Sequence, residues 1–420
     1  MNNIIEKYLN ENNERTKYVI MIIFCMILIT FGIASDSFDN IIKGIYNIII
    51  TPDTLITDYI QVGGPGAAFV NAGLLALSVV YLFSRIKVNL TGPAVASIFT
   101  VAGFALFGKN LYNVWPIIVG VWLYGRIKKE EFRQNILIAI FGTALSPIVS
   151  EITFAMGLNL RVGIILGISI GILVGMCLPP LARFFLGIHQ GYNLFNVGFT
   201  AGFIGTVILS IIKTFGLSLK GEMAWSTGQR GDYFVPALIL FLSMIILGFC
   251  MSQNPFVKLK AIFKKSGRLV TDYVIISGFG ASLINMGLMG LLGILYLTLI
   301  SGDFNGPTLG AVLTIVGFGA FGIHLRNAVP IMIGVFIMAS LSIWPVNGPE
   351  ATLAALFGIT LAPIAGTFGW VAGLIAGALH LTIVTNVGYL HGGLNLYNNG
   401  FSGGIVAIVM LPILEALKEE

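Results

Sequence analysis

Long apolar stretches separated by short polar segments run along the whole chain. Each stretch covers about 20 residues, the length that an α-helix needs to cross the hydrocarbon core of a bilayer. The short alternating segments of a transmembrane β-barrel are missing from the sequence. The pattern therefore predicts an all-α polytopic membrane protein with about 14 transmembrane segments, at 18–35, 64–84, 92–108, 112–126, 134–156, 162–183, 194–213, 235–252, 279–300, 306–322, 328–345, 350–368, 371–389 and 396–414.

Two of these segments, the third at 92–108 and the tenth at 306–322, are short and begin with Gly-Pro. Proline suits the first turn of a helix, because the N–H that it lacks would have no partner there. We expect these two segments to be half-helices or re-entrant segments. In that case fewer than 14 segments cross the membrane completely.

The two short segments are also near copies of each other. GPAVASIFTVAGFALFG (92–108) matches GPTLGAVLTIVGFGAFG (306–322), and HQGYNLFNVGFTAGFIG (189–205) matches HGGLNLYNNGFSGGIVA (391–407). A duplicated apolar chain is typical of transporters and channels built from two related halves. The sequence thus divides into a cytoplasmic N-terminal segment (1–17), a first membrane repeat (18–220) and a second membrane repeat (221–420). The second repeat contains a basic cytoplasmic loop (254–272).

Composition and charge support this organisation. The chain is 56% hydrophobic and 10% charged, with a mean hydropathy of +0.93, whereas a soluble domain is about 25% charged. Most of the 23 Lys and Arg residues fall on one side of the membrane, which the positive-inside rule makes cytoplasmic for both termini. Corresponding loops of the two halves carry opposite charge bias, and each half holds an odd number of segments. The two halves are therefore predicted to be inverted repeats.

Few other classes of function find support in the residues. The net charge of +5 follows from the loop bias, and no basic domain suggests nucleic acid binding. The basic run 258–268 is either a topology anchor or a contact for anionic lipid headgroups. The three cysteines lie in apolar runs without disulfide or metal-ligand spacing. The His-Glu-x-x-His and Gly-x-Ser-x-Gly signatures are missing, so we expect no enzyme activity, no cofactor and no bound metal.

The residues that match between the halves are mostly Gly, Pro and Asn. Proline-broken helices that meet near the middle of the membrane offer backbone groups to a solute in many transporters. The alternative is that small residues and Asn serve only to pack helices together. The candidate substrate-binding residues are four matched pairs, Asn71 and Asn285, Thr100 and Thr314, Gly92 and Gly306, and Phe104 and Phe318.

A few ionisable or polar residues are candidates for other roles. Glu151 is an acid within an apolar segment, where such groups usually mark an ion or proton pathway. Its match in the second half is Thr367, so this acid breaks the symmetry; it could also lie at the outer end of its helix, near water. Gating or helix-end roles are candidates for His189, His391, Asn193 and Asn395.

The repeated motifs resemble a known family. Two copies of the GP…T…GF..FG block are each followed by Asn-x-x-Pro-Ile, FG-x-x-L-x-PI and H-x-G-x-N-L-x-N-x-GF, over roughly residues 60–415. This arrangement resembles a family of uncharacterised bacterial polytopic membrane proteins with an internal duplication, known as a domain of unknown function. The resemblance implies a multi-pass protein of the bacterial plasma (inner) membrane and implies no activity.

A looser resemblance is to urea transporters, which are also inverted repeats with Pro-containing half-helices. It rests on Gly191-Tyr192-Asn193 and the Asn-x-Gly turns, while the urea-transporter signature Leu-Pro-x-x-Thr-x-Pro-Phe is missing. No site residue can be transferred from it.

We therefore expect a carrier for a small polar or anionic solute. A facilitative channel of the urea-channel type for a small neutral solute is the first alternative, and a non-transporting scaffold or intramembrane enzyme is the second. The expected partners are a small-molecule solute and membrane lipids. Homo-oligomer formation stays open.

Overall fold

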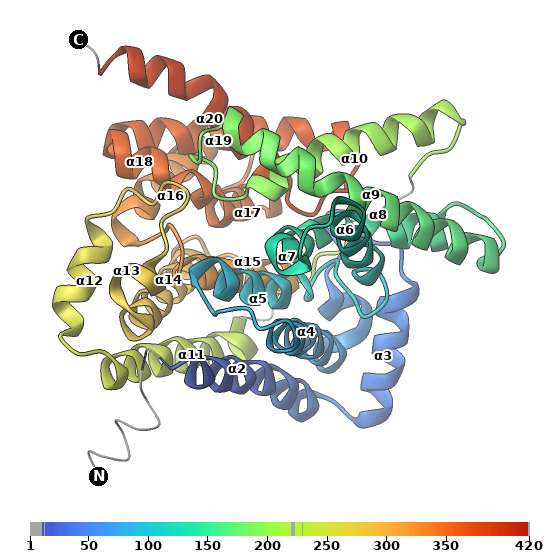
Figure 1. Ribbon diagram of the computed structural model, residues 1–420, viewed down its shortest axis with the longest axis horizontal. Helices are drawn as coiled ribbons and strands as arrows, with labels where there is room; N and C mark the ends of the chain where they lie inside the picture. The colour runs from blue at the N-terminus through green and yellow to red at the C-terminus, as the bar shows by residue number, and fades with distance from the viewer. Residues whose placement is uncertain (1–10, 12, 220–222, 229, 419–420) are drawn as a thin grey trace.

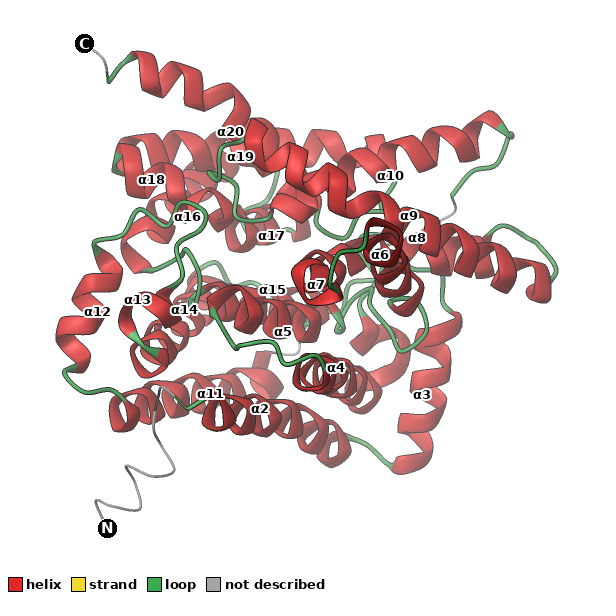
Figure 2. Ribbon diagram, viewed as in Figure 1, coloured by secondary structure: helices red, strands yellow, loops and turns green. Residues whose placement is uncertain are grey.

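The computed structural model describes residues 11, 13–219, 223–228 and 230–418. Most of the predicted N-terminal segment 1–17 thus lies outside the described residues. In the described part of the chain the regular secondary structure is helical throughout (Figure 2), apart from two isolated β-bridges. The expectation of an all-α membrane protein is confirmed.

The described residues of the first half form nine α-helices, interrupted by one 3₁₀ turn and one π-helix: α2 (Glu14–Ser35), α3 (Phe38–Ile50), α4 (Tyr59–Arg85), α5 (Gly92–Phe104), α6 (Trp115–Lys128), α7 (Phe132–Gly142), η1 (Thr143–Leu145), α8 (Ser146–Ser150), η2 (Glu151–Ala155), α9 (Leu160–Ile188) and α10 (Asn196–Thr214). The second half contains α11 (Arg230–Met251), α12 (Pro255–Phe263), α13 (Tyr273–Ser277), α14 (Phe279–Leu299), α15 (Gly306–Phe318), α16 (Leu325–Leu341), α17 (Pro349–Phe357), η3 (Gly358–Leu361), α18 (Ala362–Phe368), α19 (Trp370–His391) and α20 (Asn398–Ala416).

Every predicted segment coincides with a helix or a run of consecutive helices, but not all of them are long. Among the described residues, 10 helices or helical runs are long and apolar enough to cross a membrane. The shorter apolar helices are α5, α15 and α16. Both Gly-Pro segments end early, since α5 and α15 have 13 residues each.

The amphipathic helix α3 lies where the sequence pattern predicts no segment. Ile41 and Ile48 are buried on one face, whereas Phe38, Ile42 and Tyr46 are exposed on the other. Such a helix is too short and too polar to register as a span. It packs along α4 and leads into the loop 51–58.

The helices of the two halves pack in corresponding pairs. α2 packs on α4 as α11 packs on α14, and α6 packs on α9 as α16 packs on α19. The elements that join the halves are paired with their own counterparts, α5 with α15 and α10 with α20. Figure 1 shows α5 and α15 in the middle of the molecule, with α2 and α11 along one edge and α10, α19 and α20 along the opposite one.

The two short helices cross at a pair of glycines. A Cβ atom on Gly103 would lie 2.3 Å from the carbonyl oxygen of Gly310, and a Cβ on Gly310 would lie 2.3 Å from that of Gly103. Only glycine allows the two backbones to approach so closely. A reciprocal contact of this kind is what a two-fold axis between related copies produces.

The two short helices run in opposite directions. The start of α5 at Gly92 lies against Ala320, just after the end of α15, and the start of α15 at Gly306 lies against Leu106, just after the end of α5. Tyr273 N–H donates to the Ala320 carbonyl at 3.2 Å, and Tyr59 N–H donates to the Leu106 carbonyl at 3.0 Å. The contact between the halves is therefore reciprocal over the full length of both helices.

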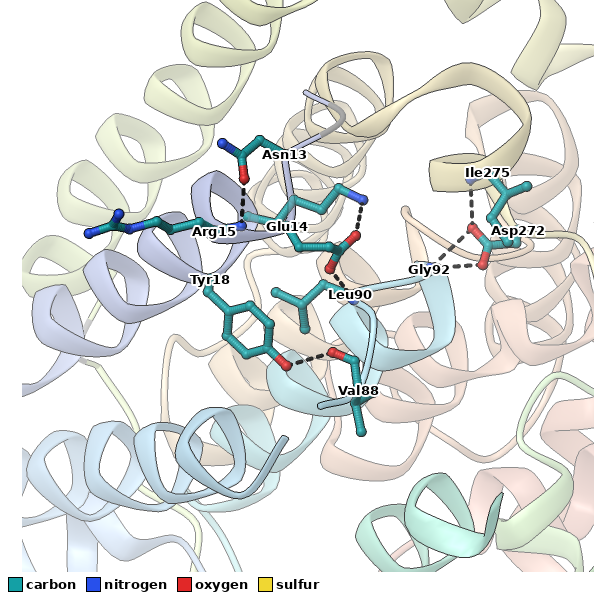
Figure 3. A network of polar contacts seen from close by, with 10 residues as sticks. Asn13, Glu14, Arg15, Tyr18, Val88, Leu90, Gly92, Asp272 and Ile275 are labelled. Carbon is teal, nitrogen blue, oxygen red and sulfur yellow. Dashed lines mark hydrogen bonds and ion pairs between the residues drawn. The ribbon is translucent and has the colours of Figure 1, made fainter. Parts of the chain in front are cut away.

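Two aspartates cap these helices from the opposite half. Gly92 N–H donates to both carboxylate oxygens of Asp272 at 3.0 Å (Figure 3). Gly306 N–H donates to Asp58 Oδ1 at 3.2 Å. Each aspartate also caps the helix that follows it, through the N–H of Ile60 or Ile275. A negative charge at a helix start satisfies free N–H groups and the helix dipole together.

The segment before α5 is fixed by the first helix, as Figure 3 shows. Glu14 accepts a hydrogen bond from Leu90 N–H at 2.8 Å, and the Tyr18 hydroxyl donates to the Val88 carbonyl at 2.6 Å. α2 thereby sets the position at which α5 enters the core.

Candidate functional site

A cavity of about 240 Å³ lies between the two short helices, α7 and the start of α10. Four of the predicted substrate-binding residues line it: Thr100 and Phe104 from α5, and Thr314 and Phe318 from α15. The remaining lining residues are Pro93, Leu137, Phe141, Leu186, Leu194, Phe195, Asn196, Val197, Gly198, Leu269, Val270, Phe321 and Tyr397. The walls are mainly apolar, with polar groups at a few positions, as is typical of small-molecule sites.

The cavity opens beside the loop that follows the basic run 258–268. Val270 lines it and has 77% of its surface exposed. Larger hollows exist, such as one of about 540 Å³ between α9 and α10, but exposed apolar side chains such as Leu173 and Val207 line that hollow. A hollow of this kind faces lipid, whereas the cavity between α5 and α15 reaches into the core.

The two threonines in the cavity have their hydroxyl hydrogens engaged. Thr100 donates to the Ala96 carbonyl at 2.7 Å, and Thr314 donates to the Gly310 carbonyl at 2.8 Å. Their oxygen lone pairs stay available as acceptors. The start of α10 offers hydrogen-bond donors rather than acceptors, because no side chain caps it and residues of its first turn line the cavity.

The matching aromatic rings on the other side of α5 and α15 pack more closely than those on the cavity side, where the ring of Phe318 lies 5.9 Å from that of Phe141 and 4.7 Å from that of Phe195. Phe104 stacks on Phe357 at a ring distance of 5.2 Å and packs on Tyr397 at 4.4 Å. Ile56, the repeat counterpart of Val270, is only 8% exposed. Ala224 holds the strand-like segment around Ile56 through hydrogen bonds to Ile56 and Asp58. The molecule is thus open on one side of the half-helices and closed on the other.

The predicted residues Asn71 and Asn285 do not line the cavity. Asn71 Nδ2 donates to the carbonyls of Ala105 and Lys109 at 2.7 and 2.9 Å. Asn285 Nδ2 donates to the carbonyls of Gly319 and Ile323 at 2.7 and 2.8 Å. These are the carbonyls left unpaired where each short helix ends. Both asparagines therefore hold the half-helices in place from behind.

Gly92 and Gly306 likewise lie outside the cavity. Their N–H groups are already paired with Asp272 and Asp58. The helix starts that the sequence offers to a solute are occupied by carboxylates of the opposite half.

The four residues predicted as gating or helix-end groups lie at or just after the ends of α9 and α19. His189 Nε2 lies 2.9 Å from Asn196 Oδ1, and His391 Nε2 lies 3.0 Å from Asn398 Oδ1. Asn193 Nδ2 donates to the Gly400 carbonyl and Asn395 Nδ2 donates to the Gly198 carbonyl. The two His–Asn pairs each stay within one half, whereas the two Asn–carbonyl contacts are reciprocal between the halves and tie α10 to α20.

Glu151 is completely buried and has no hydrogen-bond partner for either carboxylate oxygen. It begins the π-helix η2, a rare element that often occurs at functional sites. The preceding Ser150 donates its hydroxyl hydrogen to Asp53 at 2.9 Å. Thr367, the counterpart of Glu151, also has a buried hydroxyl without a partner.

Asp53 is the centre of a buried polar cluster in the first half. Besides Ser150, its carboxylate accepts hydrogen bonds from the Tyr59 hydroxyl at 2.7 Å and from Asn113 and Asn110 Nδ2 at 2.8 and 3.1 Å. Burial nevertheless raises the pKa of Asp53 to about 8, and the nearby Glu151 carboxylate adds to the rise while these donors oppose it. Burial therefore favours the protonated form of Asp53 at neutral pH.

Lys109 is another buried ionisable residue of the first half. The sequence pattern assigns it to a loop outside the membrane, whereas the structure buries it completely. Its Nζ donates to the Tyr397 hydroxyl at 2.6 Å.

Asp58, Asp272, Asp53 and Lys109 are absent from the sequence-based candidates. The sequence contains a signal for Asp58 and Asp272, because LITDY at 55–59 repeats as LVTDY at 269–273. Asp53 and Lys109 align with Gly267 and Ile323. A search restricted to residues shared by the two halves excludes them.

Comparison with protein families shows which family the chain belongs to. Residues 37–214 and 251–416 both match DUF1576, described as a protein of unknown function. The chain belongs to the DUF1576 family. The expected membership of a family with an internal duplication is thereby confirmed. No curated protein and no solved structure matches the chain, so the comparisons give no support to the resemblance to urea transporters.

Proposed function

We propose that this DUF1576 protein is a carrier, or permease, that moves a small polar or anionic solute across a bacterial plasma membrane, with both termini in the cytoplasm. The observation that carries the proposal is the cavity between two antiparallel half-helices at the junction of the repeats. Thr100, Phe104, Thr314 and Phe318 line it from equivalent positions. Discontinuous helices that meet at a repeat junction are where many transporters bind solute.

The difference between the two sides of α5 and α15 supports a carrier rather than a channel. A channel of the urea-channel type needs a continuous pore, but the Phe104, Phe357 and Tyr397 rings fill the path beyond the cavity. In an inverted repeat, exchanging the conformations of the two halves would close the space beside Val270 and open the one beside Ile56. We take the open side as cytoplasmic, because the basic run 258–268 leads into it.

Glu151 and Asp53 are the proposed proton-coupling groups. Glu151 is a buried acid without a hydrogen-bond partner, and Asp53 is connected to it through the neighbouring Ser150. The other titratable side chains of this region are tyrosines, Tyr59 bonded to Asp53 and Tyr112 bonded to Thr153 at 2.9 Å. Two carboxyl groups with different donor sets differ in proton affinity, which suits stepwise proton transfer.

Thiol labelling tests whether the cavity is open to water. In a variant without Cys25, Cys177 and Cys250, Thr100→Cys and Thr314→Cys should react with a membrane-impermeant maleimide from the cytoplasmic face. Ser97→Cys is the matched control, because Ser97 lies on α5, is completely buried and does not line the cavity. Equal protection of positions 100, 314 and 97 from both faces would contradict transport through this cavity.

Coupling is tested separately. Glu151→Gln in proteoliposomes should abolish the dependence of solute uptake on an imposed pH gradient and leave exchange of solute between the two sides intact. An unchanged uptake rate with an unchanged pH dependence would exclude Glu151 from coupling.

A further inference from the structure

Lys109 is a buried lysine without an anionic partner among the described residues. Burial lowers the pKa of Lys109 well below its usual value, and an anion bound nearby would favour its charged form. Lys109 follows the end of α5, and its side chain is completely buried. The ion pairs in the described part of the chain do not include it. Its ammonium group can donate three hydrogen bonds, and the structure provides one acceptor, the Tyr397 hydroxyl. Burying an ammonium group without a counter-charge costs several kcal/mol.

The cation lies directly behind the wall of the cavity. Its Nζ is 5.3 Å from the ring centre of Phe104 and 4.7 Å from that of Tyr397, and both rings line the cavity. Aromatic faces stabilise a cation only in part. The Tyr397 hydroxyl accepts from Lys109, which leaves its own hydrogen free for an acceptor that approaches from the cavity.

The start of α10 provides positive potential from another part of the same wall. The residues of its first turn, Asn196, Val197 and Gly198, line the cavity, and no side chain caps the helix. A helix start carries about half a positive charge and binds anions through its free N–H groups. No lining residue is acidic, and Arg268 lies next to the lining residue Leu269 at the mouth.

On the basis of the transport function proposed above, we infer that the solute is a small organic anion whose negative charge is balanced by Lys109, through Tyr397, and by the start of α10. The aromatic walls and the volume of about 240 Å³ fit a carboxylate with a small, flat, apolar body. Ile323 and Phe195 occupy the repeat positions that correspond to Lys109 and Tyr397. The cation is thus present once, which favours a single bound anion.

Each carboxylic acid is compared with its amide, which has nearly the same shape and no charge, to test whether the cavity prefers an anion. The purified protein in detergent is heated with benzoate or benzamide, with nicotinate or nicotinamide, and with lactate or lactamide. At least one acid should raise the midpoint of thermal unfolding more than its amide does. Lys109→Met should weaken the binding of this acid about tenfold or more, as expected for a lost charge-assisted hydrogen bond. It should leave the effect of the amides unchanged.

Further variants separate charge from packing. Lys109→Arg keeps the cation and should retain part of the preference for the acid. Tyr397→Phe keeps the aromatic ring, which is also present as Phe195 at the equivalent position. Like Lys109→Met, it should weaken the binding of the acid. Lys43→Met removes an exposed lysine and should change nothing. Tyr397→Phe also keeps the test valid if Lys109→Met does not fold.

Bromide gives a probe that does not depend on the choice of acid. A crystal structure of the wild-type protein in sodium bromide should show anomalous density in the cavity near Tyr397 or the start of α10. If bromide stays out of the cavity and no acid stabilises the protein more than its amide, the anion assignment is overturned.

The outcomes also separate this inference from the transport function. If amides stabilise as well as acids and Lys109→Met changes neither, the solute is neutral and transport through the cavity stands. If in addition positions 100 and 314 cannot be labelled from water, the transport function falls as well.

Discussion

The two halves of the molecule share their scaffold and differ in their buried chemistry. The glycine crossing, the aspartate caps, the asparagines behind the short helices and the His–Asn pairs all occur twice. Three further buried ionisable residues occur only once, because Asp53, Lys109 and Glu151 align with Gly267, Ile323 and Thr367 in the repeats. The duplicated glycines, aspartates, asparagines and histidines maintain the fold, whereas the duplicated threonines and phenylalanines of α5 and α15 line the cavity. The ionisable residues present in one half carry the proposed chemistry.

The largest effect is expected at the glycine crossing. Gly103→Val and Gly310→Val should each cost about 3 kcal/mol or more, because the new side chain would overlap the backbone of the opposite helix. The yield of monodisperse protein in detergent would fall to a similar extent for both. Gly187→Ala is the control, since a Cβ there meets no atom within 4 Å. A folded Gly103→Val protein with wild-type stability would contradict the close approach.

The second effect concerns the asparagines behind the half-helices. Asn71→Ala and Asn285→Ala each leave two buried carbonyls without a donor, which should cost about 2–4 kcal/mol. Chemical denaturation of the two variants should give similar losses. Asn386→Ala, at an exposed position, should change stability by less than about 0.5 kcal/mol. A large loss in only one of the two halves would break the symmetry argument.

The third effect is a dependence of stability on pH that arises from Asp53, which is present in the first half only. The pKa of Asp53 is raised from 3.8 to about 8, so the folded state binds more protons than the unfolded state between these values. Stability from this group is present below about pH 4 and is lost as the pH rises toward 8. Asp53→Asn should flatten the fall of the thermal midpoint in this window. The exposed Asp39→Asn should keep the wild-type slope, and an identical slope in both variants would exclude Asp53 as its source.

The smallest effect on stability is expected at Glu151. Neither carboxylate oxygen has a hydrogen-bond partner, so Glu151→Gln should change the free energy of unfolding by less than about 1 kcal/mol. Denaturation of the variant beside the wild type measures this. A loss of several kcal/mol would place Glu151 in the scaffold rather than in coupling.

The sequence predicts the elements of this fold well because the bilayer imposes a simple rule. Apolar length reveals the spanning helices, and Gly-Pro starts reveal α5 and α15. The amphipathic helix α3 escapes this rule, because its apolar residues cover one face rather than a continuous run. The bilayer pattern also does not report which loops fold inward, so it assigns the buried Lys109 to the outside.

The candidate site is predicted in part. Thr100, Phe104, Thr314 and Phe318 line one cavity, as residues matched between two crossing helices can. Asn71, Asn285, Gly92 and Gly306 match equally well but pair with backbone carbonyls or carboxylates instead. Repetition alone does not separate a residue that faces the axis between the helices from one that supports a helix from behind. That distinction requires the three-dimensional contacts.

The most direct test of the account labels two equivalent positions, one in each half. In the variant without native cysteines, Val270→Cys should react with an impermeant maleimide from the cytoplasmic face, and Ile56→Cys should react slowly from either face, in line with exposures of 77% and 8%. With a transported solute present, labelling of position 56 from the outside should rise while labelling of position 270 falls. Labelling of the two positions that stays constant, or that rises and falls together, would contradict alternation between the two halves.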